Sequence, residues 1–165
     1  MKKTTLYILS LSAIVLILTA CPVSISYPLD AVGSNKIDKK IIGTWVSDSS
    51  DVLKKVVVSK GSDENSYAIE IIEAGSNYNL SQKKFTGYVT EIDGKKFLYN
   101  RAEGTASYYT YCYEMPDKKT LILYDISLLD GGVDAVKSVQ SYRDQVSSSM
   151  KKSGFLSGKQ TLKKE

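Results

Sequence analysis

Few side chains in this chain could support chemistry, and the residue types that usually do so are unevenly represented. Its 165 residues include two cysteines and twelve tyrosines but no histidine. Histidine is the commonest general base near neutral pH and the commonest metal ligand in proteins. Catalysis or metal binding would therefore depend on carboxylates, lysines or a cysteine thiolate.

Neither the cysteines nor the carboxylates form a recognisable catalytic or metal-binding motif. Cys112 has no histidine partner, and we interpret it as a small buried hydrophobe. The carboxylates that could pair for acid–base work are Glu70, Glu73, Glu91 and Glu103, and no spacing brings two of them together. Asp51, Asp63 and Glu64 lack the spacing of a calcium loop. The sequence thus predicts no catalytic residue, metal or cofactor, and an enzyme is the third of three functional hypotheses.

Tyrosines crowd the run from Ser107 to Met115. In a strand, alternation would place Tyr109, Tyr111 and Tyr113 on one face and Cys112 on the other. A wall of phenol rings, apolar in body and polar at the tip, suits an amphipathic ligand. Strand propensity alone also enriches tyrosine. These three tyrosines are the candidate ligand-binding residues.

The first twenty residues have the pattern of a signal helix. Lys2 and Lys3 precede an apolar run, residues 6–18, and small residues then lead to Cys21. As a helix the run would span about 20 Å, short of the roughly 30 Å hydrocarbon core of a bilayer. The pattern favours a cleaved signal peptide over a transmembrane helix. The alternative is an uncleaved anchor followed by an ordinary thiol at Cys21.

The stretch Leu18-Thr19-Ala20-Cys21 resembles the lipobox of bacterial lipoproteins. The resemblance implies cleavage between Ala20 and Cys21, a diacylglyceryl group on the Cys21 sulfur, and a fatty-acyl group such as palmitate on its amine. Two acyl chains suffice for stable anchoring. The resemblance implies a membrane-anchored protein of the bacterial cell envelope. Pro22, in place of the aspartate of a retention signal, favours the outer membrane, facing the periplasm, if the cell has two membranes.

Charge and composition limit the partners and the domain organisation. Loss of residues 1–20 removes two lysines, so basic residues fall from 22 to 20 against 18 acidic ones, a net charge of +2. Such a balance argues against nucleic acid as a partner. Residues 21–40 contain prolines, glycine and serines with little apolar periodicity, which predicts a flexible tether. Residues 41–165 would form a single domain.

That domain has a mainly β pattern with one late helix. Strand-type runs separated by turn signals cover residues 41–47, 53–60, 66–73, 84–92, 95–101, 107–115 and 120–127. A helical pattern follows over 133–152, with apolar residues at spacings of three and four, and residues 159–164 could add a last strand. The helix would bury its apolar stripe against the outside of the sheet.

The dipeptide Asp93-Gly94 predicts a two-residue hairpin, because both central residues of a type I′ turn need positive φ. Such a loop fixes the register of the flanking strands. It would place Glu91 opposite Lys96, Tyr88 opposite Tyr99 and Val89 opposite Leu98.

The stretch Ile42-Gly43-Thr44-Trp45 resembles the Gly-X-Trp signature of lipocalins. The resemblance implies an antiparallel up-and-down barrel of about eight strands, in which Trp45 closes one end and Gly43 lets the backbone pass close by. The chain departs from the pattern in two ways. It has no Thr-Asp-Tyr motif, and where lipocalins cover the tryptophan with an arginine the last strand offers only lysines. The chain also resembles small bacterial lipoproteins with lipocalin-like domains.

Two further functional hypotheses follow from this reading. The first is a non-enzymatic binding module for a small apolar or amphipathic ligand in the envelope. The second is a protein-interaction module, an inhibitor or envelope assembly factor, whose barrel is filled by its own side chains. An eight-stranded barrel is wide enough for either. The interior near Tyr109–Tyr113 would distinguish them.

Overall fold

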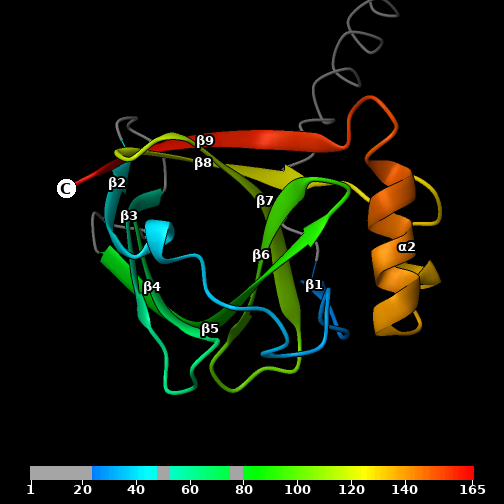
Figure 1. Ribbon diagram of the computed structural model, residues 1–165, viewed down its shortest axis with the longest axis horizontal. Helices are drawn as coiled ribbons and strands as arrows, with labels where there is room; N and C mark the ends of the chain where they lie inside the picture. Colours follow the sequence, from blue (N-terminus) through cyan, green and yellow to red (C-terminus); the bar gives the residue numbers. More distant parts are fainter. Residues whose placement is uncertain (1–23, 48–52, 75–79) are drawn as a thin grey trace, which may run out of the picture.

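The computed structural model describes residues 24–47, 53–74 and 80–165. The predicted lipidation and cleavage site, Ala20 and Cys21, lies outside these ranges. Eight strands close an antiparallel barrel, in which each strand pairs with the next and the last pairs with the first (Figure 1). They are β2 (Gly43–Ser47), β3 (Leu53–Lys60), β4 (Tyr67–Ala74), β5 (Leu80–Ile92), β6 (Lys95–Ala102), β7 (Tyr108–Asp117), β8 (Thr120–Ile126) and β9 (Leu156–Lys164). The predicted mainly β, up-and-down barrel is confirmed.

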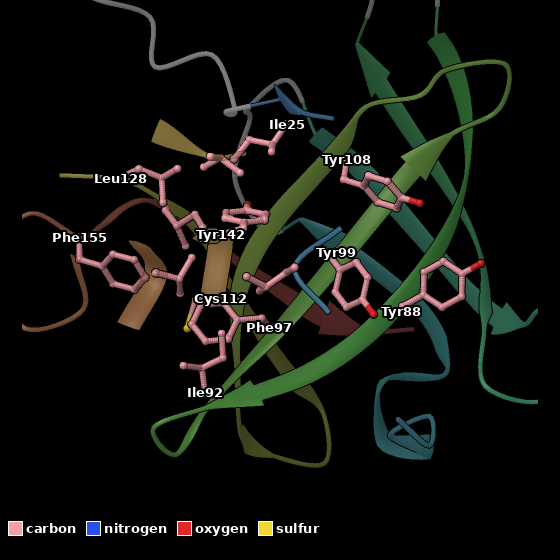
Figure 2. Close-up of a cluster of buried hydrophobic side chains, with 14 residues drawn as sticks. Ile25, Tyr88, Ile92, Phe97, Tyr99, Tyr108, Cys112, Leu128, Tyr142 and Phe155 are labelled. Carbon is pink, nitrogen blue, oxygen red and sulfur yellow. The ribbon is translucent and has the colours of Figure 1, made fainter. Parts of the chain in front are cut away.

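Alternation along the strands separates two hydrophobic clusters. The inner cluster draws residues from all eight barrel strands and lies in the interior around Trp45, Val58, Ile69, Leu98 and Leu162. The outer cluster lies on the other face of β5 to β8, where side chains of the late helix and of the N-terminal segment cover the barrel wall (Figure 2). Both faces of this part of the sheet are therefore buried.

The β5–β6 hairpin has the predicted register. Asp93 and Gly94 have φ values of 49° and 78°, as a type I′ turn requires. The three predicted cross-strand pairs are present, and the rings of Tyr88 and Tyr99 stack with centroids 5.6 Å apart.

The late helix, α2 (Val139–Ser149), lies against the outside of the barrel, with Tyr142 and Val146 buried in the outer cluster. It begins later than predicted. Ser138 caps the helix by accepting the amide hydrogen of Ser141, and a separate 3-10 turn, η3 (Val133–Ala135), precedes it. The side chain of Ser141 bonds back to the amide of Ser138, so local capping sets this boundary.

The N-terminal segment is packed, which differs from the predicted tether. Residues 24–42, here called the strap, begin with a short strand, β1 (Ser24–Ile25), paired with Tyr109 and Tyr108 of β7. Leu29 is fully buried in the outer cluster. Asp30 binds Arg143 of α2 at 2.7 Å and accepts the hydroxyl of Thr90 at 2.7 Å. The described part of the predicted tether therefore belongs to the domain.

Several strand boundaries also differ from the prediction. β5 begins at Leu80 and β9 at Leu156, because pairing with β4 and β8 extends past the apolar residues that mark a strand in the sequence. β7 continues through Pro116 to Asp117, where the register with β8 shifts. A proline is tolerated in a strand at such an irregularity because the ladder lacks a hydrogen bond there.

The alternating strand directions give the barrel two distinct ends. We call the end where β3, β5, β7 and β9 begin the rim, and β1 lies there. We call the opposite end the base. There β2 begins, and the strap leads into a 3-10 turn, η1 (Lys39–Ile41). In Figure 1 the strap is the blue to cyan segment that runs from β1 to this turn.

Candidate functional site

The three candidate tyrosines share the inner face of β7 but lie at different depths. Tyr113 is buried in the inner cluster, toward the base. Tyr111 and Tyr109 follow toward the rim and are only partly buried. The ring of Phe85 meets Tyr109 edge-on, with centroids 6.2 Å apart. The structure thus separates Tyr113 from the other two.

Around Tyr109 and Tyr111 the inner face becomes polar. We call this set the rim site; it comprises Phe85, Asn100, Tyr109, Tyr111 and Asp125. Asn100 stands directly across from Tyr109, and Asp125 stands across from Tyr111. Residues opposite one another in antiparallel strands project from the same face, so all five belong to the interior.

Asn100 is the least expected residue of the rim site. Its side chain is 2% exposed, and its Oδ1 has no hydrogen-bond partner among the described residues. A buried acceptor without a partner costs about 1–3 kcal/mol. Such an atom is rare in folded proteins and calls for a physical explanation. A ligand that donates a hydrogen bond into the barrel would remove this cost.

The rim site also disfavours negative charge. Burial raises the pKa of Asp125, and among the described residues no cation pairs with it. Burial also raises the pKa of Tyr111, and the nearby carboxylates of Asp125 and Glu73 add to the effect. The phenol therefore remains protonated, and Asp125 is easier to protonate than a solvated aspartate. At the edge of this region Lys83 pairs with Glu73 at 2.6 Å.

The base carries a pocket of about 680 Å³ that sequence reasoning did not find. It is lined by Asp38, Lys39, Lys40, Gly94, Lys95, Lys96, Cys112, Tyr113, Glu114, Met115, Asp117, Lys118 and Lys164. We call this the base pocket. Its six lysines come from η1, from the β5–β6 hairpin, from the turn after β7 and from the end of β9. Lysines so distant in sequence form no motif, and only barrel closure brings them together.

Asp38 is the central acid of the base pocket. Its carboxylate accepts from Lys96 Nζ at 2.8 Å, from the Lys40 amide at 3.0 Å and from the Tyr113 hydroxyl at 3.4 Å. Burial opposes its ionisation, but the bonds from Lys96 and Lys40 outweigh that effect and lower its pKa. Asp38 is therefore ionised at neutral pH.

Trp45 lies above η1 as a fully buried plug, with 0% exposure. Its indole N–H donates to the Ile41 carbonyl at 2.8 Å. Lys164 covers the indole with its Nζ 5.1 Å from the ring centroid, and donates to the Ile42 carbonyl at 2.8 Å. A lysine of the last strand thus supplies the cation over the indole, and the Arg143 side chain binds Asp30.

Cys112 faces the outer cluster and is 1% exposed. Burial raises the pKa of its thiol to about 11. The nucleophilic species of cysteine is the thiolate, so this thiol is unreactive near neutral pH. The structure therefore agrees with the interpretation of Cys112 as a packing residue.

The described residues contain neither a metal-binding cluster nor a membrane-spanning helix. No group of three His, Cys, Asp or Glu side chains there lies close enough to hold a metal ion. In the same ranges no helix combines the length and hydropathy needed to cross a bilayer. Comparison with family models, with curated proteins and with solved structures gave no significant match to this chain.

Proposed function

We propose that this protein is a lipid-anchored envelope protein whose barrel binds a small amphipathic molecule at the rim site without converting it. The observation that carries the proposal is the orphan acceptor of Asn100, buried beside the partly exposed rings of Tyr109 and Tyr111. Rings of this kind contribute apolar contact and a polar tip. The Asn100 oxygen and the protonated Tyr111 phenol would fix the polar part of the ligand.

The position of β1 supports a membrane source for such a molecule. Ser24, three residues after the proposed lipidated Cys21, pairs with Tyr109 at the rim. Three extended residues span at most about 11 Å. The proposed anchor would therefore lie beside the rim, so that a lipid-like ligand could reach the rim site directly from the bilayer.

The test is extraction of the natively anchored protein with a mild detergent, followed by mass spectrometry of the small molecules that accompany it. Asn100→Leu removes the orphan acceptor at similar volume, and Tyr111→Phe removes the inner hydroxyl. Each should lower ligand occupancy about tenfold, since a buried hydrogen bond contributes roughly 1.5 kcal/mol. The matched control is Tyr124→Phe, because Tyr124 belongs to the outer cluster.

Two results would contradict the proposal. One is the absence of any small molecule above the detergent background. The other is an occupancy that Asn100→Leu and Tyr111→Phe leave equal to that of the control. The intact mass of the same preparation tests the anchor separately, because a cleaved and acylated chain begins at Cys21 and carries the added mass of its acyl groups.

The protein-interaction hypothesis has its own support in the loop between β8 and α2. Leu129 and Val133 are exposed there on either side of Gly131-Gly132. Exposed apolar side chains close together can mark a partner surface. A Leu129→Ser, Val133→Ser variant that loses a protein co-purified with the wild type, at unchanged rim-site occupancy, would favour this second function.

A further inference from the structure

We propose that the base pocket binds a small organic anion of multiple charge, such as a phosphate ester. This site is separate from the rim site, because buried residues of the inner cluster, including Trp45, Leu121 and Leu162, lie between them. The inference does not depend on the anchor or on the ligand proposed for the rim.

The first argument is local charge. Six lysines line the pocket against three carboxylates, those of Asp38, Glu114 and Asp117, which leaves a local charge of +3. The full chain has a net charge of +4, so all of the chain outside the pocket contributes only +1 and is close to neutral. A concave site lined by one sign of charge concentrates ligands of the opposite sign.

The second argument is the pairing of the lysines. Lys96 binds Asp38, and Lys164 lies over Trp45. Among the described residues, Lys39, Lys40, Lys95 and Lys118 form no ion pair within the chain. Four ammonium groups around one hollow repel each other, and a multivalent anion between them would relieve that repulsion.

The third argument is that a carboxylate already occupies part of the site. Asp38 takes the bonds of Lys96 and Tyr113 that an anionic ligand group would otherwise receive. The protein thus shows how an oxygen anion is held there. It also limits affinity, because the ligand must compete with Asp38 for Lys96.

The fourth argument concerns the rest of the ligand. Tyr113 and Met115 line the pocket together with the aliphatic stems of the lysines. The volume of about 680 Å³ lies within the roughly 300–1,000 Å³ typical of sites for small organic molecules. The pocket therefore fits an anion with an organic body better than a bare inorganic ion.

The experiment titrates the full chain, held in a non-ionic detergent, with inorganic pyrophosphate at low ionic strength. Two-dimensional NMR follows the backbone amides. We expect saturable shifts of Gly94, Lys95 and Lys118, and none at Lys151 or Lys159, which lie outside the pocket. An alkyl diphosphate should bind more tightly than pyrophosphate, because its chain would contact Tyr113 and Met115.

The variants separate a site from a general response to charge. Lys95→Gln with Lys118→Gln should weaken binding roughly fivefold, since each exposed ion pair contributes about 0.5 kcal/mol. Lys151→Gln with Lys159→Gln changes the net charge equally and should leave affinity unchanged. Asp38→Asn should strengthen binding, because it releases Lys96 and raises the local charge from +3 to +4.

Three results overturn the proposal. The first is the absence of saturable shifts at the pocket amides. The second is equal weakening by the two double lysine variants, which would indicate screening of the whole protein's charge. The third is an Asp38→Asn protein that is folded by circular dichroism and binds pyrophosphate no better than the wild type.

Discussion

The two ends of this barrel are built from the same eight strands yet satisfy their buried polar groups in opposite ways. At the base, the Trp45 indole donates to Ile41, and the Tyr67 hydroxyl donates to the Asp38 carbonyl. At the rim, among the described residues, Asn100 keeps an unpartnered oxygen, and the partly buried Asp125 forms no ion pair. The strap makes the difference, because it crosses the base and supplies the carbonyls that the base side chains need.

The difference between the two ends indicates that the base contributes to stability, whereas the rim is suited to binding. Buried polar groups with partners favour one rigid arrangement, whereas unsatisfied buried groups cost stability. We therefore expect substitutions at the base to destabilise the fold, and substitutions that remove charge at the rim to stabilise it.

Removal of the tryptophan plug should have the largest effect. Trp45→Ala deletes a fully buried indole and its hydrogen bond, and should lower the free energy of unfolding by about 3–5 kcal/mol. Urea unfolding followed by circular dichroism measures it. Tyr109→Ala at the rim is the matched aromatic deletion, and should cost less because Tyr109 is only partly buried. Equal losses would refute the contrast between the ends.

A smaller loss is expected from Gly43→Ala at the start of β2. Gly43 has φ = 145°, which side chains rarely adopt, and a Cβ there would meet the end of the Lys164 side chain at 2.6 Å. Backbone strain of this kind costs about 1–3 kcal/mol. The lysine should also shift from the indole, so the fluorescence of Trp45 should change together with the unfolding midpoint. A midpoint within error of the wild type would show that the backbone relaxes freely there.

Substitution of the rim carboxyl, Asp125, should increase the stability of the fold. The pKa of Asp125 is raised in the folded state, so folding favours its protonated form, and its contribution to stability is lost as pH rises through that raised pKa. Asp125→Asn should therefore be more stable than the wild type at pH 7, by about 1 kcal/mol, with the difference disappearing below pH ~4. Unfolding curves at pH 3.5, 5 and 7 measure this trend. A variant less stable at pH 7 would mean that the carboxylate has a stabilising partner.

Substitution of the base carboxyl, Asp38, should instead lower stability, and its effect should be the smallest of the four. The pKa of Asp38 is lowered in the folded state, so its contribution is present above its ordinary value and is lost as pH falls through the folded pKa. Asp38→Asn should cost about 0.5–1 kcal/mol at pH 7, because Lys96 is largely solvated, and this cost should shrink as pH falls through the folded pKa. The same pH series measures it, and a difference that grows toward low pH would contradict the assignment.

Much of the barrel could be predicted because its signals are local. Asp93-Gly94 sets a register through turn geometry alone, and period-two alternation places Tyr109, Tyr111 and Tyr113 on one face. The strap could not be predicted in this way. Ile25 and Leu29 bury their side chains one at a time along an extended segment, which leaves no period to detect.

The candidate sites depend on long-range contacts, and for that reason the sequence revealed them only in part. The sequence predicted that the three tyrosines share one face. It could not predict that Tyr113 is packed while Tyr109 and Tyr111 are only partly buried, because this depends on the other strands of the barrel. Lys164 covers Trp45 only because the last strand pairs with the first. Asn100 looks like an ordinary polar residue until its neighbours on β5 and β7 are in place.

The pairing of β1 with β7 has a consequence for how the molecule would move in its envelope. Under the proposed lipidation, Ser24 stays within about 11 Å of the acylated residue. A domain held by so short a linker would diffuse with the bilayer but could not rotate end over end. The rim site would stay turned toward the lipid and the base pocket toward the water. Membrane-borne and dissolved molecules would therefore approach the domain from opposite sides.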